Sequence, residues 1–415
     1  MCSVTSDADV RATVAAIWRI ESARIVATLV RVVGDLGLAE DLAQDALVDA
    51  LQQWPESGVP RNPGAWLTAV AKRKAIDGWR RRDGLDERYR KLAHDLDETT
   101  DVQWQPIEDD VLRLVFAACH PVLAREAQLA LTLKVVGGLD TASIARLFLL
   151  PVPTIQQRIV RAKKALSAAR VPFEIPDPQE WPSRLSAVLG VVYLMFTEGY
   201  AASSGDRWMR TELANEAVRL GRILARLLPR EPEVLGLLAL MEFQASRFAA
   251  RATPEGAAVL LADQDRRRWD HSAIARGRAA LARADALHRG RGPYQLQAAI
   301  AQCHATARSV DETDWASIVM LYEVLGRIAP NPVVDLNRAV AVSMASGPAA
   351  ALRIVDELVE KGALRGSHLL PSVRGELLAR LGRDDEARTE FAAAARLARN
   401  GSERAVLQRK LSSLT

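Results

Sequence analysis

The chain has 415 residues, of which 49% are hydrophobic and 26% charged, a balance typical of a globular protein of about two to four domains. It contains no long uncharged apolar run and no basic-then-apolar N-terminal segment, so we expect neither a membrane span nor a secretory leader. Cys2, Cys119 and Cys303 lie far apart without metal-ligand spacing, which predicts a reduced, cytoplasmic protein with no metal and no cofactor. The Ala-, Leu- and Arg-rich composition with 5% aromatic residues favours an all-α fold.

The net charge of +4 is small, but the charges are unevenly distributed. Residues 32–60 carry six acidic side chains and no Lys or Arg, whereas residues 61–91 carry ten basic and four acidic side chains. This separation suggests two partners, one basic and one a polyanion. Charge alone leaves open that these are ordinary solvated helix faces.

Residues 8–82 form the first predicted domain, with breaks at the Gly-rich 34–37 and at the Pro-containing 55–63. The expected helices cover 10–33, 39–54 and 65–82. In the second helix, Asp41, Asp45 and Asp49 recur every four residues on a face separate from the apolar stripe. Stacked carboxylates repel one another, and a cationic partner would offset this repulsion. For this helix taken alone, an acidic bias near its N-terminus that aids solubility is the favoured alternative.

The third expected helix of this domain combines an apolar stripe with basic residues and tryptophans. Its cations are Lys72, Arg73, Lys74, Arg80, Arg81 and Arg82, and Trp66 and Trp79 lie among them. Basic side chains hold phosphates and aromatic faces stack on unpaired bases, so the pattern suits nucleic acid. Tryptophans in such a pattern are nonetheless more often core residues.

Residues 83–108 lack apolar periodicity and predict a linker. In the next domain, 109–172, helices are expected over 109–118, 124–136, 141–148 and 154–169. Thr154 is predicted to cap the last of these helices. The candidate DNA contacts come after Thr154 in the same expected helix and are Gln156, Gln157, Arg158, Arg161 and Lys163. Between Thr141 and Phe173 there are six basic residues and no acidic one, which is typical of a DNA-reading helix.

Residues 180–415 are predicted to form a separate helical domain. The segment 372–400 places Gly375, Leu378, Gly382 and Phe391 where a tetratricopeptide helix-turn-helix unit places its packing residues. A weaker copy follows Gly347. Tetratricopeptide-like packing is therefore expected, with an irregular helical bundle as the alternative.

Three segments together resemble bacterial RNA polymerase sigma factors of the extracytoplasmic-function (ECF) type. They are AEDLAQDALVDALQQW, NPGAWLTAVAKRKAIDGWRRR and LDTASIARLFLLPVPTIQQRIVRAKKAL, in that order. Sigma factors of this type keep only sigma regions 2 and 4. The long C-terminal portion, with YLMFTEGY at 193–200, resembles one ECF group that carries a tetratricopeptide-like extension.

The resemblance implies roles for particular residues. Asp41, Gln44, Asp45 and Asp49 would dock on core RNA polymerase, on the clamp helices of β′, with β a further contact. The −10 promoter element would be engaged by Arg61, Asn62, Trp66, Lys72, Arg73, Lys74, Arg80 and Arg81. The −35 element would be read by Thr154, Gln156, Gln157, Arg158, Arg161 and Lys163 from the second helix of a helix-turn-helix. The linker would run toward the RNA exit path.

The sequence thus predicts a sigma factor whose C-terminal domain, 180–415, modulates activity by packing on the sigma domains or by binding a protein or peptide. No Walker-type Gly loop and no Ser-His-Asp grouping can be argued from spacing, so no enzyme is expected. Two alternatives stay open: a helix-turn-helix regulator that works without polymerase, and a tetratricopeptide adaptor with vestigial DNA elements.

Overall fold

The computed structural model describes residues 7–81, 108–148, 150–177, 179–200, 209–253, 258–398 and 400–414, and its named elements there are all helical, as the composition predicts. An isolated bridge between Ala252 and Ala258 is the extended pairing recorded among these residues. The chain divides into two compact units, Met1–Val191 and Val192–Thr415, with the division inside helix α9 (Trp181–Tyr200). No helix in the described part is both long and apolar enough to cross a membrane.

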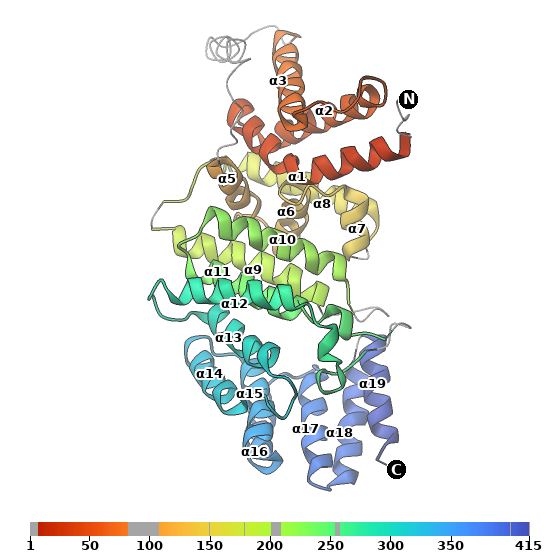
Figure 1. The fold of residues 1–415 in the computed structure, drawn as a ribbon, viewed down its shortest axis with the longest axis vertical. Coiled ribbons are helices and arrows are strands. Elements are labelled where there is room, and N and C mark those ends of the chain that lie inside the picture. The colour runs from red at the N-terminus through yellow and green to blue at the C-terminus, as the bar shows by residue number, and fades with distance from the viewer. Residues whose placement is uncertain are drawn as a thin grey trace. The chain divides into compact units, whose positions relative to one another are not determined.

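The first unit begins with three mutually packed helices, α1 (Asp7–Val33), α2 (Leu36–Ser57) and α3 (Pro63–Arg81) (Figure 1). Asp35 starts α2 by accepting the backbone N–H of Leu38 at 2.8 Å. The core comes from the predicted apolar stripes. Its fully buried members include Ile25, Leu29, Ala43, Ala46, Ala50, Trp54, Leu67 and Ala71.

The expected break at Pro55 is wrong, because α2 continues through Pro55 to Ser57. The helix ends only at Gly58, whose φ of 77° lies in the left-handed region that glycine adopts without steric cost. The buried ring of Trp54 packs edge-on against Trp66 of α3, with ring centroids 5.3 Å apart. Tertiary packing of this kind holds the last turn of α2 despite its proline.

The second half of this unit contains α5 (Glu108–Ala118), α6 (Arg125–Val135), α7 (Thr141–Phe148) and α8 (Val152–Ala168). The predicted linker lies almost entirely outside the described residues. Gly138, at φ 68°, reverses the chain after α6, and Asp140 accepts the backbone N–H of Ser143 at the start of α7. Ile144, Ile155 and Ile159 are buried, so α7 and α8 pack as a helix-turn-helix against α6.

The predicted capping role of Thr154 is wrong. Helix α8 begins two residues earlier, with Pro151 at its N-cap and no capping side chain. Pro153 lies in the first turn, where a missing N–H removes no helical hydrogen bond. Pro151 and Pro153 therefore start the helix, and Thr154 lies exposed inside it.

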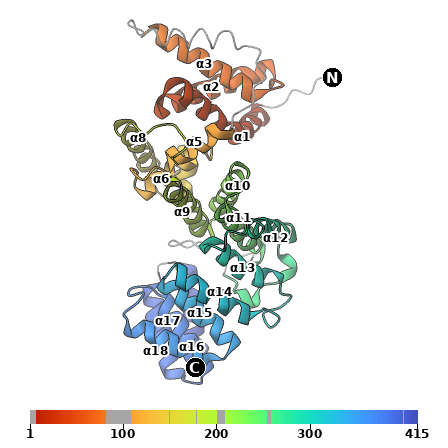
Figure 2. The same ribbon diagram turned by 90° about the vertical axis from the view of Figure 1, so that its left-hand side faces the viewer.

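The second unit is a succession of neighbouring helices (Figures 1 and 2). Its first group comprises α10 (Thr211–Leu227), α11 (Pro232–Ala245), α12 (His271–Asp285) and α13 (Pro293–Thr306). Three short 3-10 turns lie between α11 and α12: η1 (Phe248–Ala250), η2 (Leu261–Asp263) and η3 (Arg266–Arg268). Helix α11 is apolar on nearly all sides and buried, because α10, α12 and α13 surround it.

The remaining helices are α14 (Trp315–Ile328), α15 (Pro332–Ala345), α16 (Pro348–Glu360), α17 (Leu369–Arg380), α18 (Asp384–Leu397) and α19 (Gly401–Ser412). The segment singled out from the sequence forms the α17–α18 helix pair. Gly375 lets Phe391 approach to within 3.0 Å of the position a Cβ would take, and Leu378 is fully buried. Gly382, at φ 72°, makes the turn between the helices. This pairing fits the repeat pattern, and tetratricopeptide-like packing of the whole domain stays a prediction.

Candidate nucleic-acid interface

Helix α8 exposes a polar face opposite its buried stripe. Ile155, Ile159, Ala162 and Leu166 are buried, while Thr154, Gln156, Gln157, Arg161 and Lys164 are exposed and Arg158 is half-buried. At 100° per residue, Gln157, Arg161 and Lys164 share the side directly opposite the core. This side carries both bidentate hydrogen-bonding groups and phosphate-binding cations, as a helix inserted into a major groove requires.

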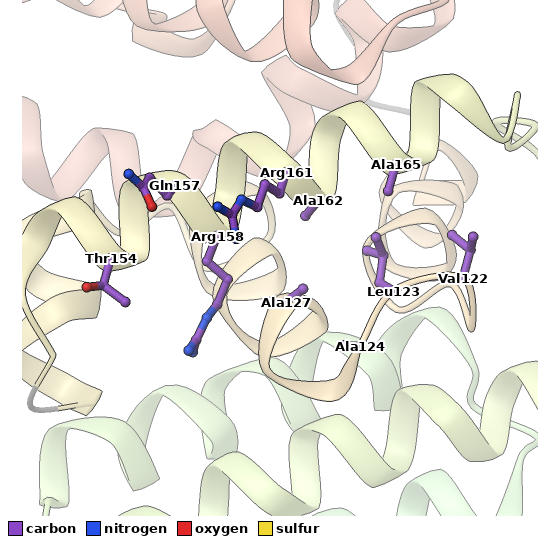
Figure 3. Close-up of a pocket in the computed structure, with 10 residues that line it drawn as sticks. All are labelled: Val122, Leu123, Ala124, Ala127, Thr154, Gln157, Arg158, Arg161, Ala162 and Ala165. Atoms are coloured by element: carbon purple, nitrogen blue, oxygen red, sulfur yellow. The ribbon is translucent and has the colours of Figure 1, made fainter.

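A shallow open groove of about 340 Å³ runs along one flank of this face (Figure 3). Thr154, Gln157, Arg158 and Arg161 line it from α8. On the other side, it is lined by residues 122–124, which precede α6, and by Ala127 in the first turn of α6. In Figure 3 the labelled arginines extend from α8 on this side. Four of the predicted −35 contacts are therefore brought together on one surface.

Lys163 is different, because it lies on the other flank of α8 and is already paired. Its Nζ contacts Oε2 of Glu40 on α2 and lies 3.6 Å from Oδ1 of Asp41. Lys134 of α6 lies 3.3 Å from the other carboxylate oxygen of Glu40, which also accepts the side-chain N–H of Gln44. Glu40 is only 4% exposed. We call Glu40, Lys134 and Lys163 the Glu40 cluster.

The Glu40 cluster joins helices from the two halves of the first unit. A second ion pair does the same nearby, since Arg31 of α1 lies 3.5 Å from the buried carboxylate of Asp110 on α5. Buried charges of this kind are tolerated only when paired. The ion pairs therefore help to hold α1 and α2 against α5, α6 and α8.

The acidic face of α2 is narrower than the spacing of its aspartates suggested. Asp41 and Asp45 are exposed together with Val48, whose exposed fraction is 49%. Asp49 lies at the edge of this face, 3.0 Å from Nζ of Lys74 on α3. A cationic partner of Asp49 is thus supplied within the chain, and the exposed face combines Asp45, Asp41 with its contact to Lys163, and an apolar side chain.

Helix α3 and the preceding loop place the predicted −10 residues in different environments. Arg61 and Arg73 are exposed, and Trp66 is half-buried against Trp54. Asn62 accepts the backbone N–H of Ala65 at 3.1 Å. Burial, and secondly the charge of Arg31, lower the pKa of Lys72. The side chains of Arg80 and Arg81 lie outside the described residues.

Cys119 and His120, which the sequence places side by side, belong to the packing between α5 and α6. Cys119 is buried beside the hydroxyl of Thr132 at 3.4 Å, and burial raises the pKa of its thiol to about 11. Gln128 donates to the carbonyls of both residues. The described residues include no group of three His, Cys, Asp or Glu side chains arranged to hold a metal.

Comparisons with known proteins identify these domains. Residues 19–84 match the family described as Sigma-70 region 2, and residues 113–166 match Sigma-70, region 4. Residues 184–285 match a family of unknown function, DUF6596. No solved structure matches the chain.

Two relatives extend the comparison. The uncharacterized protein R00370 of Rhizobium meliloti (strain 1021) is 44% identical over 398 residues, which are 93% of this chain and 92% of that protein. The probable ECF RNA polymerase sigma factor SigI of Mycobacterium tuberculosis (strain ATCC 25618 / H37Rv) is 28% identical over 218 residues, covering 51% of this chain and 70% of that protein.

Regions 2 and 4 in this order define an RNA polymerase sigma factor, which is a non-enzymatic initiation factor. The chain belongs to the sigma-70 family and is of the ECF type, with a C-terminal helical extension that includes the DUF6596 segment. Its function is to bind core RNA polymerase and promoter DNA and to direct promoter-specific transcription. This confirms the family expected from the three motifs.

Proposed function

We propose that three separate surfaces of the first unit perform this function. The exposed face of α2 formed by Asp41, Asp45 and Val48 docks on the β′ clamp helices of the polymerase. The loop at Arg61 and Asn62 and helix α3 engage the −10 element in the cytoplasm, where the polymerase works. The face of α8 that carries Gln157 and Arg161 reads the −35 element.

The observation that carries this proposal is the polarity of the two exposed helix faces. Helix α8 presents cations and amides with no carboxylate between Val152 and Ala168, whereas α2 presents carboxylates around an exposed valine. The first face complements DNA, and the second complements a basic and partly apolar protein surface. A regulator that works without polymerase would gain nothing from the α2 face.

Lys163 belongs both to the contact between region 2 and region 4 and to the set of residues expected to contact the −35 element. Its ammonium group can pair with Glu40 and Asp41 or with a DNA phosphate, but the two sites cannot both hold it at full strength. We propose that promoter binding draws Lys163 and Lys134 away from Glu40 and loosens the contact between region 2 and region 4. The contact is then a resting arrangement of the free protein, and polymerase and DNA together supply the interactions that replace it.

The helical second unit is proposed to modulate this activity, either by packing on the sigma domains or by binding a protein or peptide. The family of unknown function covers about the first two fifths of this unit and most of α9, and no family model matches the part beyond residue 285. The stacked α14–α18 helices provide the repeated surface on which such a partner could bind.

The test is run-off transcription from a cognate promoter with purified core polymerase and full-length variants. Asp45→Ala should lower transcript yield by weakening polymerase binding, and Arg161→Ala by weakening −35 binding. Adding excess core polymerase should rescue Asp45→Ala but not Arg161→Ala. If both variants respond identically to excess polymerase, the division of labour between α2 and α8 is wrong.

A further inference from the structure

The second unit contains a group of cations that the sigma function does not use. Arg247 follows α11, Arg251 follows η1 and Arg266 opens η3, and Tyr200 and Trp269 lie among them. The Arg251 guanidinium lies 3.4 Å from the centre of the Tyr200 ring, and that of Arg266 lies 4.6 Å from the centre of the Trp269 ring. We call Arg247, Arg251, Arg266 and Trp269 the arginine cluster.

Arg247 connects the two aromatic rings of this group. Its guanidinium is 5.8 Å from the centre of the Tyr200 ring and 5.9 Å from that of Trp269, and its Nη2 donates to the Tyr200 hydroxyl at 2.5 Å. Arg247 is 9% exposed and Arg251 is 5% exposed. Burying guanidinium groups so close together is unfavourable unless negative charge offsets their repulsion.

Among the described residues, no carboxylate forms an ion pair with Arg247 or Arg266. The side chain of Gln244 and the Tyr200 hydroxyl accept from Arg247, while the carbonyls of His304 and Ala307 accept from Arg266. Glu312 affects Arg266 through its field without pairing with it. Among the residues that the structure describes, the hydrogen-bond acceptors of Arg247 and Arg266 are thus neutral dipoles.

The same unit contains a site in which a buried carboxylate balances the charge of neighbouring arginines. Glu242, which is 1% exposed, accepts from Arg222 at 2.7 Å and from Arg276 at 3.1 Å. There the fold buries a carboxylate between two arginines and satisfies both of its oxygens. At Arg247 and Arg266 the cations are in place, and no described carboxylate pairs with either of them.

Several buried polar atoms beside the arginine cluster have no hydrogen-bond partner. They are Nη2 of Arg266, Nε1 of Trp269, Nδ1 of His304 and Oε1 of Gln264. Trp269 is 4% exposed, so its indole N–H is a buried donor that solvent does not satisfy. Arg266 and His304 are half-buried as whole residues, although these two nitrogen atoms are buried.

Nη2 of Arg266 and Nε1 of Trp269 are hydrogen-bond donors without an acceptor, and they lie beside buried positive charge. A ligand with several acceptor oxygens and no donors fits this arrangement. We propose that Arg247, Arg266 and the indole N–H of Trp269 bind the phosphate group of a small ligand. Arg251, which packs against the face of the Tyr200 ring, adds positive charge to this site. A phosphate dianion offers more lone pairs than a carboxylate and matches the fork of donors on each guanidinium. The second unit is then a sensor of a phosphorylated small molecule.

His304 provides an internal readout. Burial first, and then the charges of Arg247 and Arg266, lower the pKa of His304 to about 4. A bound phosphate dianion places negative charge beside the same two arginines and raises this pKa. Histidine NMR signals of the full-length protein therefore report occupancy of the site independently of the heat of binding.

The test is calorimetric titration of the full-length protein with inorganic phosphate at constant ionic strength, with acetate in a parallel arm. We expect phosphate to bind and to raise the pKa of His304. Arg266→Gln and Trp269→Phe should each weaken binding at least fivefold. Arg266→Gln also removes the hydrogen bonds from Arg266 to the carbonyls of His304 and Ala307, and this loss can disturb the local fold. Trp269→Phe removes only the indole N–H and keeps an aromatic ring, so it tests the proposed site independently. Arg267→Gln is the control, since this neighbouring side chain is exposed and paired with Asp265.

Three outcomes overturn the proposal. The first is that the wild-type protein shows no phosphate-dependent shift of His304. The second is that acetate binds as tightly as phosphate, which would assign the site to a carboxylate. The third is that folded Trp269→Phe and Arg267→Gln bind phosphate equally well. None of these results bears on promoter recognition by the first unit.

Discussion

Replacing Glu40 by Gln tests whether the Glu40 cluster holds regions 2 and 4 together. The substitution keeps the size of the side chain and removes its charge. Lys134 then loses its carboxylate partner and Lys163 keeps only the exposed Asp41 at 3.6 Å, while the two lysine side chains remain only 13% and 16% exposed. At 3.3 Å and an effective dielectric constant of about 20, one such pair attracts by about 5 kcal/mol before desolvation is subtracted.

Removing one member of a fully buried ion pair costs about 3–5 kcal/mol, because the other charge is left uncompensated. The two lysines reach the surface and can move their ammonium groups toward water, which reduces this cost. We therefore expect Glu40→Gln to weaken the contact by about 2–3 kcal/mol, which corresponds to a roughly 30- to 150-fold larger open population.

Native-state hydrogen exchange of the full-length protein measures this opening. Amides of α2, α6 and α8 that are protected by the contact should exchange faster by that factor, while those of α11 should not change. Asp41→Asn is the matched control, because Asp41 lies next to Glu40 but its side chain is 75% exposed, and exposed pairs contribute only about 0–1 kcal/mol. Equal exchange in Glu40→Gln and Asp41→Asn would refute the role assigned to the buried carboxylate.

Three further predictions concern single sites. Arg161→Ala should weaken binding to a −35 duplex by about 1–3 kcal/mol in fluorescence anisotropy, whereas Arg170→Gln beyond the end of α8 should leave it within error; equal losses would remove α8 as the reader. Asp45→Ala should weaken core polymerase binding about tenfold without changing duplex affinity, and Glu56→Ala should not. Because the pKa of His304 is lowered to about 4, the unfolded chain binds its proton at higher pH than the folded one does. Stability should therefore fall as pH falls from 6.5 toward 4, by about 2 kcal/mol at pH 5, and thermal melts of His304→Gln should lack this loss.

The helices of both sigma regions could be predicted from sequence because their signals are local. Apolar periodicity and flanking Gly and Pro residues located α7 at residues 141–148, as observed, and located the other helices of the first unit to within a few residues. The errors occurred at prolines. A break was expected at Pro55, and the last helix of the unit was expected to begin after Pro153. Packing of Trp54 keeps Pro55 inside α2, and the first turn of α8 accommodates Pro153.

The site was predictable only where exposure follows from helical spacing. The spacing of buried residues in α8 indicates which of its cations face outward, and Arg161 does so. It could not show that Lys163 pairs with Glu40, because these residues are 123 positions apart in the chain. Nor could it separate Glu40 from Asp41, since both lie in one acidic run and only the tertiary fold buries the first. The arginine cluster was not predicted because its members lie in the irregular segment between α11 and α12, where no helical spacing indicates which side chains are buried.

The central claim is that this chain directs polymerase to promoters through regions 2 and 4. It is tested most directly by run-off transcription of genomic DNA fragments with purified core polymerase, with and without the full-length protein. Discrete promoter-specific transcripts that depend on the protein and are lost in Asp45→Ala and Arg161→Ala are the predicted result. Tight binding of the protein to duplex DNA with no protein-dependent transcript would contradict it.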